Sequence, residues 1–177
     1  MRGLGERHQA TFVPAANEVT IGYERFAAPN RRRLSGPALR TFLTIADRWG
    51  LTEEQRRLVL GYPSRSTYHN WAKLAREGQP FTLDVDALMR ISAVFGIHQA
   101  LGVLFADEAE GLRWLKGPHM APLFGGQPPL ALVTSGAQDG LMAVRRFLDT
   151  ARGGLYMPPN GLDAAFTPYE DADIVIR

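Results

Sequence analysis

The chain has 177 residues, with 20 Lys and Arg residues against 18 Asp and Glu residues, and a formal net charge of +2. Because 45% of its residues are hydrophobic and 21% are charged, it can bury a sizeable core, which excludes a wholly disordered protein. It has no cysteine, which excludes a disulfide scaffold, a thiol nucleophile and a thiolate metal site.

Residues 1–33 are predicted to form a flexible basic arm. This segment is rich in Gly, Pro, Ala and Arg and has no sustained helical period, although residues 19–21 could form a short extended piece. It ends in three consecutive arginines, which could contact phosphate or remain solvated. It has no secretory signal, and no apolar stretch of the chain approaches the ~18 residues of a membrane span, so we expect a cytoplasmic protein.

Residues 34–80 are predicted to form a helix-turn-helix region. The first helix should open at Gly36 and Pro37, and apolar residues then recur with a helical period. Thr52 is a predicted N-cap of the second helix, with a capping-box partner three residues later. A Gly-Tyr-Pro turn and a further N-cap, Ser64, lead into the third helix. These proportions are those of a helix-turn-helix, although a plain helical hairpin would share them.

The third helix, residues 65–77, would be the recognition helix, whose N-terminal residues enter the major groove of DNA. Arg65 is the best candidate for a guanine edge, whereas the hydroxyl groups suit phosphate. The first 80 residues carry 13 Lys and Arg against 7 Asp and Glu, a net charge of +6, which favours a nucleic-acid partner. The candidate DNA-binding residues are Ser64, Arg65, Ser66, Thr67, Tyr68, His69 and Lys73.

Residues 81–153 are predicted to form a small helical domain. Helices are expected at residues 83–95 and 97–105, separated by a break at Gly96, and again at residues 107–115 and 137–151. A loop at residues 117–130 contains four prolines and three glycines. The predicted fold class is therefore all-α: an N-terminal helix-turn-helix domain, a small helical domain, and extended arms at both ends.

Residues 154–177 are predicted to form an extended acidic tail. The chain after residue 80 carries 7 Lys and Arg against 11 Asp and Glu, a net charge of −4. A basic half and an acidic half indicate two surfaces with different partners, although charge also drifts along ordinary domains. The chain ends in Ile-Val-Ile-Arg, an apolar run that could pair as an edge strand.

No pattern in the sequence assembles an active site. The four histidines are scattered without the spacing of a metal-binding pair, and there is neither a phosphate-binding loop nor a nucleophile elbow. We therefore predict a non-enzymatic protein with no metal and no cofactor.

A second sequence motif, after the helix-turn-helix, begins with a helix that ends in Trp114 and Leu115 and leads into Pro118. Next comes a loop with the sequence Gly-Gly-Gln-Pro-Pro-Leu. It is followed by a helix that carries Val and Leu and ends before Gly153. From about residue 39 to residue 153 the chain resembles the Xre/MbcA/ParS family of antitoxins, although the stretch from residue 118 to 126 is longer than expected and Pro128 is extra. The residues assigned to the scaffold of its C-terminal domain are Trp114, Leu115, Pro118, Gly126, Pro129 and Leu130.

The resemblance implies an antitoxin of a type II toxin–antitoxin module. Its partner would be a RES-domain toxin that consumes NAD+ or transfers ADP-ribose, bound by residues 81–153, and the antitoxin would be a homodimer that represses its own operon through operator DNA. The alternative is a DNA-binding transcriptional regulator with a C-terminal partner- or ligand-sensing domain and no toxin.

A pocket that binds the phosphates of NAD+ should be basic, so the acidic tail suits it. We expect the tail to cover this pocket, with aromatic anchors and acidic groups that meet basic residues of the toxin. The candidate toxin-binding residues are Tyr156, Phe166, Tyr169, Glu170, Asp171, Asp173 and Arg177.

Overall fold

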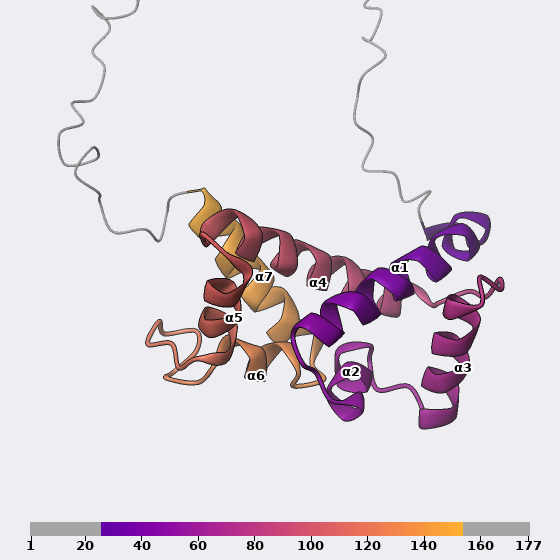
Figure 1. The fold of residues 1–177 in the computed structure, drawn as a ribbon, viewed down its shortest axis with the longest axis horizontal. Helices are drawn as coiled ribbons and strands as arrows, with labels where there is room; N and C mark the ends of the chain where they lie inside the picture. The colour runs from indigo at the N-terminus through magenta and orange to yellow at the C-terminus, as the bar shows by residue number, and fades with distance from the viewer. Residues whose placement is uncertain (1–25, 154–177) are drawn as a thin grey trace, which may run out of the picture.

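The computed structural model describes residues 26–153, and within this range the chain folds into helices without a strand (Figure 1). This architecture confirms the predicted all-α class for the described residues. The predicted arms lie outside them, except for the last residues of the N-terminal arm. The helices are α1 (Ala28–Arg48), α2 (Glu53–Val59), α3 (Arg65–Arg76), α4 (Val85–Leu104), α5 (Glu108–Lys116), α6 (Pro129–Val133) and α7 (Gln138–Arg152).

Helix α1 begins at Ala28, and the predicted start at Gly36 and Pro37 was wrong. The early turns are held by contacts with the segment before α4: Arg31 donates to the carbonyl of Leu83 at 3.1 Å, and the hydroxyl of Ser35 accepts from the Leu83 N–H at 2.8 Å. Pro37 is tolerated inside the helix because it lies on the exposed face, where water can reach the carbonyl group that it leaves unpaired. The arginine triplet is therefore helical and does not end an arm.

Helix α4 is one continuous helix, and the predicted break at Gly96 was wrong. Gly96 is buried, and the guanidinium group of Arg145 from α7 lies directly over it. Arg145 also donates to the carbonyl of Ser92 at 3.4 Å and to the carboxylate of Asp149 at 2.6 Å. Glycine is present here because any Cβ atom would overlap the guanidinium group, and not because the helix ends.

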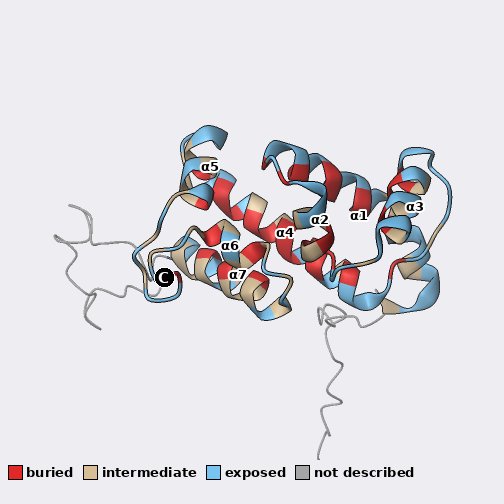
Figure 2. Cartoon of the chain, turned by 90° about the horizontal axis from the view of Figure 1, so that it is seen from below, coloured by how far each residue is buried: buried red, intermediate tan, exposed pale blue. Residues whose placement is uncertain are grey.

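Helix α4 connects the two ends of the described fold. It packs against α1 on one side and against α5 and α7 on the other (Figure 1). Buried residues occur along α4, and the core forms one continuous cluster that draws on all the helices (Figure 2). The expectation that no apolar stretch approaches the length of a membrane span was wrong for α4, which is long and apolar enough to cross a membrane. However, 50% of its apolar window is buried inside the fold, as in the core helix of a folded domain.

Candidate nucleic-acid interface and partner-binding loop

The turn between α2 and α3 requires a left-handed backbone at two successive residues. Gly61 has φ of 89° and Tyr62 has φ of 61°, after which Pro63 leads into α3. Glycine adopts this region without strain, whereas a tyrosine does so only when its surroundings hold it there. As predicted, Thr52 begins α2 with a complete capping box whose partner is Gln55.

Three side chains that the sequence did not single out fasten this turn. Arg57 is buried; it donates to the carbonyl of Pro63 at 2.9 Å and to the carboxylate of Glu54 at 3.0 Å. The hydroxyl of Tyr62 donates to the other oxygen of Glu54 at 2.7 Å, and the Arg57 guanidinium carbon lies 4.5 Å from the centre of the Tyr62 ring. The hydrogen bond to Glu54 and its negative charge raise the pKa of Tyr62. The turn is therefore held rigidly between the two helices.

Small hydroxyl groups crowd the N-terminus of α3. The Ser64 hydroxyl caps the helix by accepting from the Thr67 N–H at 3.1 Å, and it lies 2.9 Å from the Ser66 hydroxyl and 2.8 Å from that of Thr67. Hydroxyl groups and free backbone N–H groups at a helix start are suited to phosphate. The arrangement is therefore compatible with a DNA backbone contact.

The predicted DNA-binding residues differ in their exposure to solvent. Most of them are exposed on one side of α3, and Thr67 is half-buried. Tyr68 is only 5% exposed and packs in the core, so its side chain cannot reach a groove of DNA. The helical period explains this, because Tyr68 shares its face with the buried residues Ala72 and Ala75. The exposed residues are Ser64, Arg65, Ser66, His69 and Lys73.

An acidic residue of α2 lies against the exposed side of α3. The carboxylate of Glu53 is 3.8 Å from Nε of Arg65 and 3.3 Å from Nε2 of His69. Glu53 therefore lowers the positive potential at Arg65 and His69, two of the three basic side chains among the candidate DNA-binding residues. Only the folded arrangement brings Glu53 there, because it is twelve residues from Arg65 in the chain.

The long loop between α5 and α6 is anchored by an aromatic cluster. Trp114 lies with its ring centre 5.9 Å from that of Phe124 and 6.1 Å from that of Phe147 of α7. The ring of His119 is inserted beside them, 4.8 Å from Phe124, and its Nδ1 accepts from the Ala121 N–H at 3.2 Å. This cluster gives the proline-rich loop its fixed course, since the buried Phe124 ties its middle to α5 and α7.

The other scaffold residues are placed around this cluster. Leu115 is fully buried, Pro129 is buried in the first turn of α6, and Leu130 packs against the core. Gly126 has φ of 82°, and its N–H donates to the carbonyl of His119 at 3.1 Å, closing the loop. Pro118, in contrast, is exposed.

The loop also presents apolar side chains to solvent. Met120 is 85% exposed and Leu123 is 40% exposed, and both belong to a backbone that the aromatic cluster holds in place. Because the loop is ordered, these two side chains are available for contact with a protein partner. The sequence did not single out these two residues, because periodicity carries no information on which loop side chains point outward.

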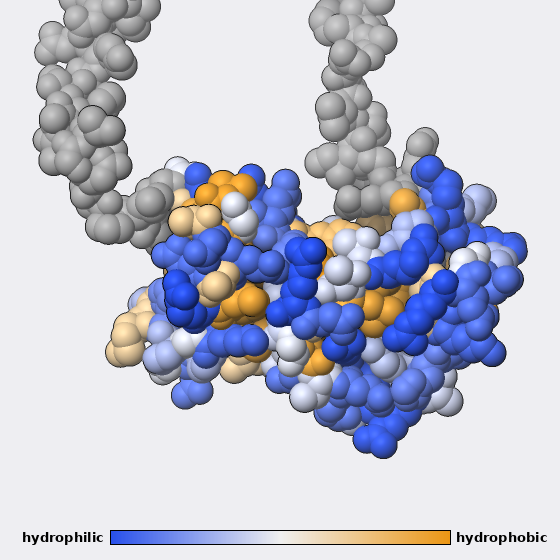
Figure 3. All heavy atoms as spheres, in the orientation of Figure 1, coloured by the Kyte–Doolittle hydropathy of each residue, from blue (hydrophilic) through white to orange (hydrophobic). Residues whose placement is uncertain are grey.

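The seven predicted toxin-binding residues of the tail lie outside the described residues. Within residues 26–153, no group of three His, Cys, Asp or Glu side chains is placed to hold a metal ion. The part of the molecule formed by α1, α2 and α3 has a largely hydrophilic surface in Figure 3, interrupted by apolar side chains next to α4.

Comparisons with known proteins assign both parts of the chain. Residues 28–96 match the antitoxin Xre-like helix-turn-helix domain, and residues 100–154 match the antitoxin Xre/MbcA/ParS C-terminal toxin-binding domain. The chain is also similar to the uncharacterized protein y4oB of Sinorhizobium fredii (strain NBRC 101917 / NGR234). The two are 34% identical over 131 residues, which cover 73% of this chain and 96% of the relative.

Proposed function

Because the chain belongs to the Xre/MbcA/ParS family of antitoxins, we propose that it neutralises a RES-type toxin that consumes NAD+ or transfers ADP-ribose. The supporting observation is the tandem arrangement of a helix-turn-helix domain and a toxin-binding domain along one chain. In this proposal the protein acts in the cytoplasm as a homodimer, and with its toxin it represses its own operon.

In this proposal, two parts of the chain bind the toxin. The ordered loop before α6 offers Met120 and Leu123 as apolar contacts. The acidic tail begins where the toxin-binding domain ends, and its carboxylates suit the basic surroundings of a phosphate-binding pocket. The loop would thus dock the antitoxin, while the tail covers the NAD+ site of the toxin.

The first experiment purifies the chain with its bound partner from the native host and measures NAD+ turnover by that partner, with and without the chain. The full chain is expected to abolish turnover, whereas a chain that ends at Gly153 binds the toxin with much weaker inhibition. A second variant replaces Glu170, Asp171 and Asp173 by their amides. This change preserves the length of the tail and removes three of its negative charges. Full inhibition by the truncated chain would eliminate the role of the tail, and absence of binding by the full chain would eliminate the toxin assignment.

Operator binding is assigned to the exposed side of α3. Arg65 is the central candidate, because it is exposed one residue after the N-cap of the recognition helix. Replacing one base-contacting arginine costs about 1–3 kcal/mol, so Arg65→Ala should weaken operator binding about five- to 150-fold in a gel shift. Arg113→Ala removes the same charge from an exposed site on α5 and should leave the affinity unchanged. Equal affinities for both variants would remove Arg65 from the interface.

A further inference from the structure

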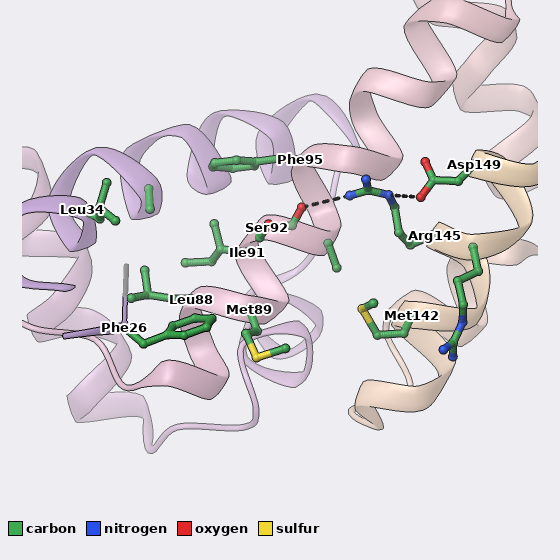
Figure 4. A pocket seen from close by; sticks show the side chains of 13 residues that line it. Phe26, Leu34, Leu88, Met89, Ile91, Ser92, Phe95, Met142, Arg145 and Asp149 are labelled. Atoms are coloured by element: carbon green, nitrogen blue, oxygen red, sulfur yellow. Dashed lines mark hydrogen bonds and ion pairs between the residues drawn. The ribbon is translucent and has the colours of Figure 1, made fainter. Parts of the chain in front are cut away.

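An apolar groove with a volume of about 480 Å³ lies between the start of α1, the middle of α4 and α7. Figure 4 shows Phe26 and Leu34 at one side of the groove, Leu88 and Met89 along its floor, and Met142 at the other side. Leu34 is 37% exposed and Met89 is 39% exposed. Apolar side chains gathered in a hollow of this size favour an occupant that covers them.

The course of the chain indicates which segment could occupy the groove. Phe26, the first described residue, itself lines the groove, so residues 19–25 continue directly from its wall. In this segment apolar and polar residues alternate: Val19, Ile21 and Tyr23 share one side of an extended chain, and Thr20, Gly22 and Glu24 share the other.

The length of this segment also fits. Seven extended residues reach about 23 Å, whereas the floor of the groove from Leu88 to Phe95 advances only about 10 Å along α4. A segment that starts at Phe26 can therefore cross the groove from α1 to α7.

The charges at the far side of the groove are complementary to this segment. Its α7 side carries Arg145 and Arg146. Arg145 is bound to Asp149 at 2.6 Å, but Arg146 forms no ion pair with any residue between 26 and 153. The segment and the residue before it contribute two carboxylates, Glu18 and Glu24, and no cation before Arg25.

We propose that residues 18–25 of this same chain occupy the groove, with Val19, Ile21 and Tyr23 on its apolar floor and Glu18, at the end farthest from Phe26, toward Arg146. In this position the segment contacts α1, α4 and α7, the helices that line the groove. This proposal concerns a surface that neither the toxin contact nor the DNA contact uses.

Cysteine cross-linking tests the proposal directly, because the natural chain has no cysteine. One variant combines Ile21→Cys with Met89→Cys, and its matched control combines Thr20→Cys with Met89→Cys. Under dilute oxidising conditions, the first pair should form an intramolecular disulfide about ten-fold faster than the second, because residues 20 and 21 would face opposite ways. Equal rates, or no intramolecular product, would overturn the proposal, and cross-linked dimers would assign the groove to a second copy.

A second measurement requires no substitution of the residues that line the groove. Methyl NMR spectra of the methionines are compared between the full chain and a chain that lacks residues 1–24. The signals of Met89 and Met142 should shift, whereas that of Met120, on the exposed loop, should not. Unshifted signals would contradict the proposal, and shifts only on removal of residues 154–177 would assign the groove to the tail.

Discussion

The hydrogen bond from Tyr62 to Glu54 links the turn to α2 through a group that can ionise. The phenol donates at 2.7 Å, so its ionisation would replace an attraction by repulsion between two anions. This raises the pKa of Tyr62 above its ordinary value of 10.0, despite the opposing effect of Arg57. Because the pKa is higher in the folded than in the unfolded state, the stabilisation is present below pH 10.0 and is lost as the pH rises through the folded value.

We therefore expect Tyr62 to titrate at higher pH than a tyrosine without a carboxylate beside it. The measurement is the ultraviolet absorbance of phenolate, taken as the difference between the natural chain and Tyr62→Phe. Glu54→Gln removes the negative charge, leaves Arg57 as the neighbouring ion, and should lower the pKa of Tyr62. An unchanged titration of Tyr62 in Glu54→Gln would contradict the role of this carboxylate.

Glu53 is expected to restrain DNA binding, because its carboxylate lies near both Arg65 and His69. Glu53→Gln removes one negative charge from the α3 surface and should raise operator affinity about three- to ten-fold at low salt. The gain should shrink as salt screens the charge. Glu77→Gln, at the other end of α3, is the control, and an equal gain in both variants would show a general charge effect only.

At the scale of the helices, local signals predicted most elements and long-range contacts decided the rest. The caps at Thr52 and Ser64 set the starts of α2 and α3, as predicted, because capping uses residues close in sequence. The early start of α1 depends on the bonds to Leu83, and the continuity of α4 across Gly96 depends on α7. Neither contact can be read from a local pattern, and the short helix α6 was missed because it lies inside a proline-rich loop.

Alanine substitutions at three glycines within helices can separate the effect of helix propensity from the effect of contacts with other helices. A Cβ atom at Gly140 would lie 2.7 Å from the backbone oxygen of Leu132, which cannot move away easily. At Gly96 it would overlap the guanidinium group of Arg145, the end of a long side chain that can turn away at the cost of its hydrogen bonds, and at Gly102 it would meet nothing within 4 Å.

Urea unfolding should therefore rank the three alanine variants. Gly102→Ala should stabilise the fold by about 1 kcal/mol through helix propensity alone. Gly96→Ala should change stability by less than about 1 kcal/mol, because the same gain offsets displacement of Arg145. Gly140→Ala should destabilise by about 1–2 kcal/mol, because overpacking exceeds the gain. A stabilised Gly140→Ala would show that α6 can shift without cost.

At the scale of the whole molecule, the candidate surfaces were only partly predictable. Exposure on one side of α3 follows from its helical period, which also places Tyr68 inside. Glu53 next to Arg65 and the aromatic cluster around Phe124 bring together different elements, and no spacing in the sequence reveals them. The sequence could therefore indicate which segments matter, whereas the neighbours that tune them required the fold.

The described part of the molecule should unfold as one unit, although two family domains meet within it. The boundary between the matched domains falls inside α4, between residues 96 and 100, and α4 packs against both α1 and α7. Unfolding either domain alone would expose a buried face of this shared helix. We therefore expect a single transition for both domains.

Two single-tryptophan variants can report on the two ends separately. One retains Trp49 at the end of α1 and the other retains Trp114 in α5, with the remaining tryptophans replaced by Phe. Within each variant, the midpoint of tryptophan fluorescence should coincide with that of far-ultraviolet circular dichroism. Adding Ile91→Ala in the buried face of α4 should cost about 2–4 kcal/mol and lower both midpoints together. A fluorescence midpoint that separates from the circular dichroism midpoint would mean that the two domains unfold independently, despite the helix they share.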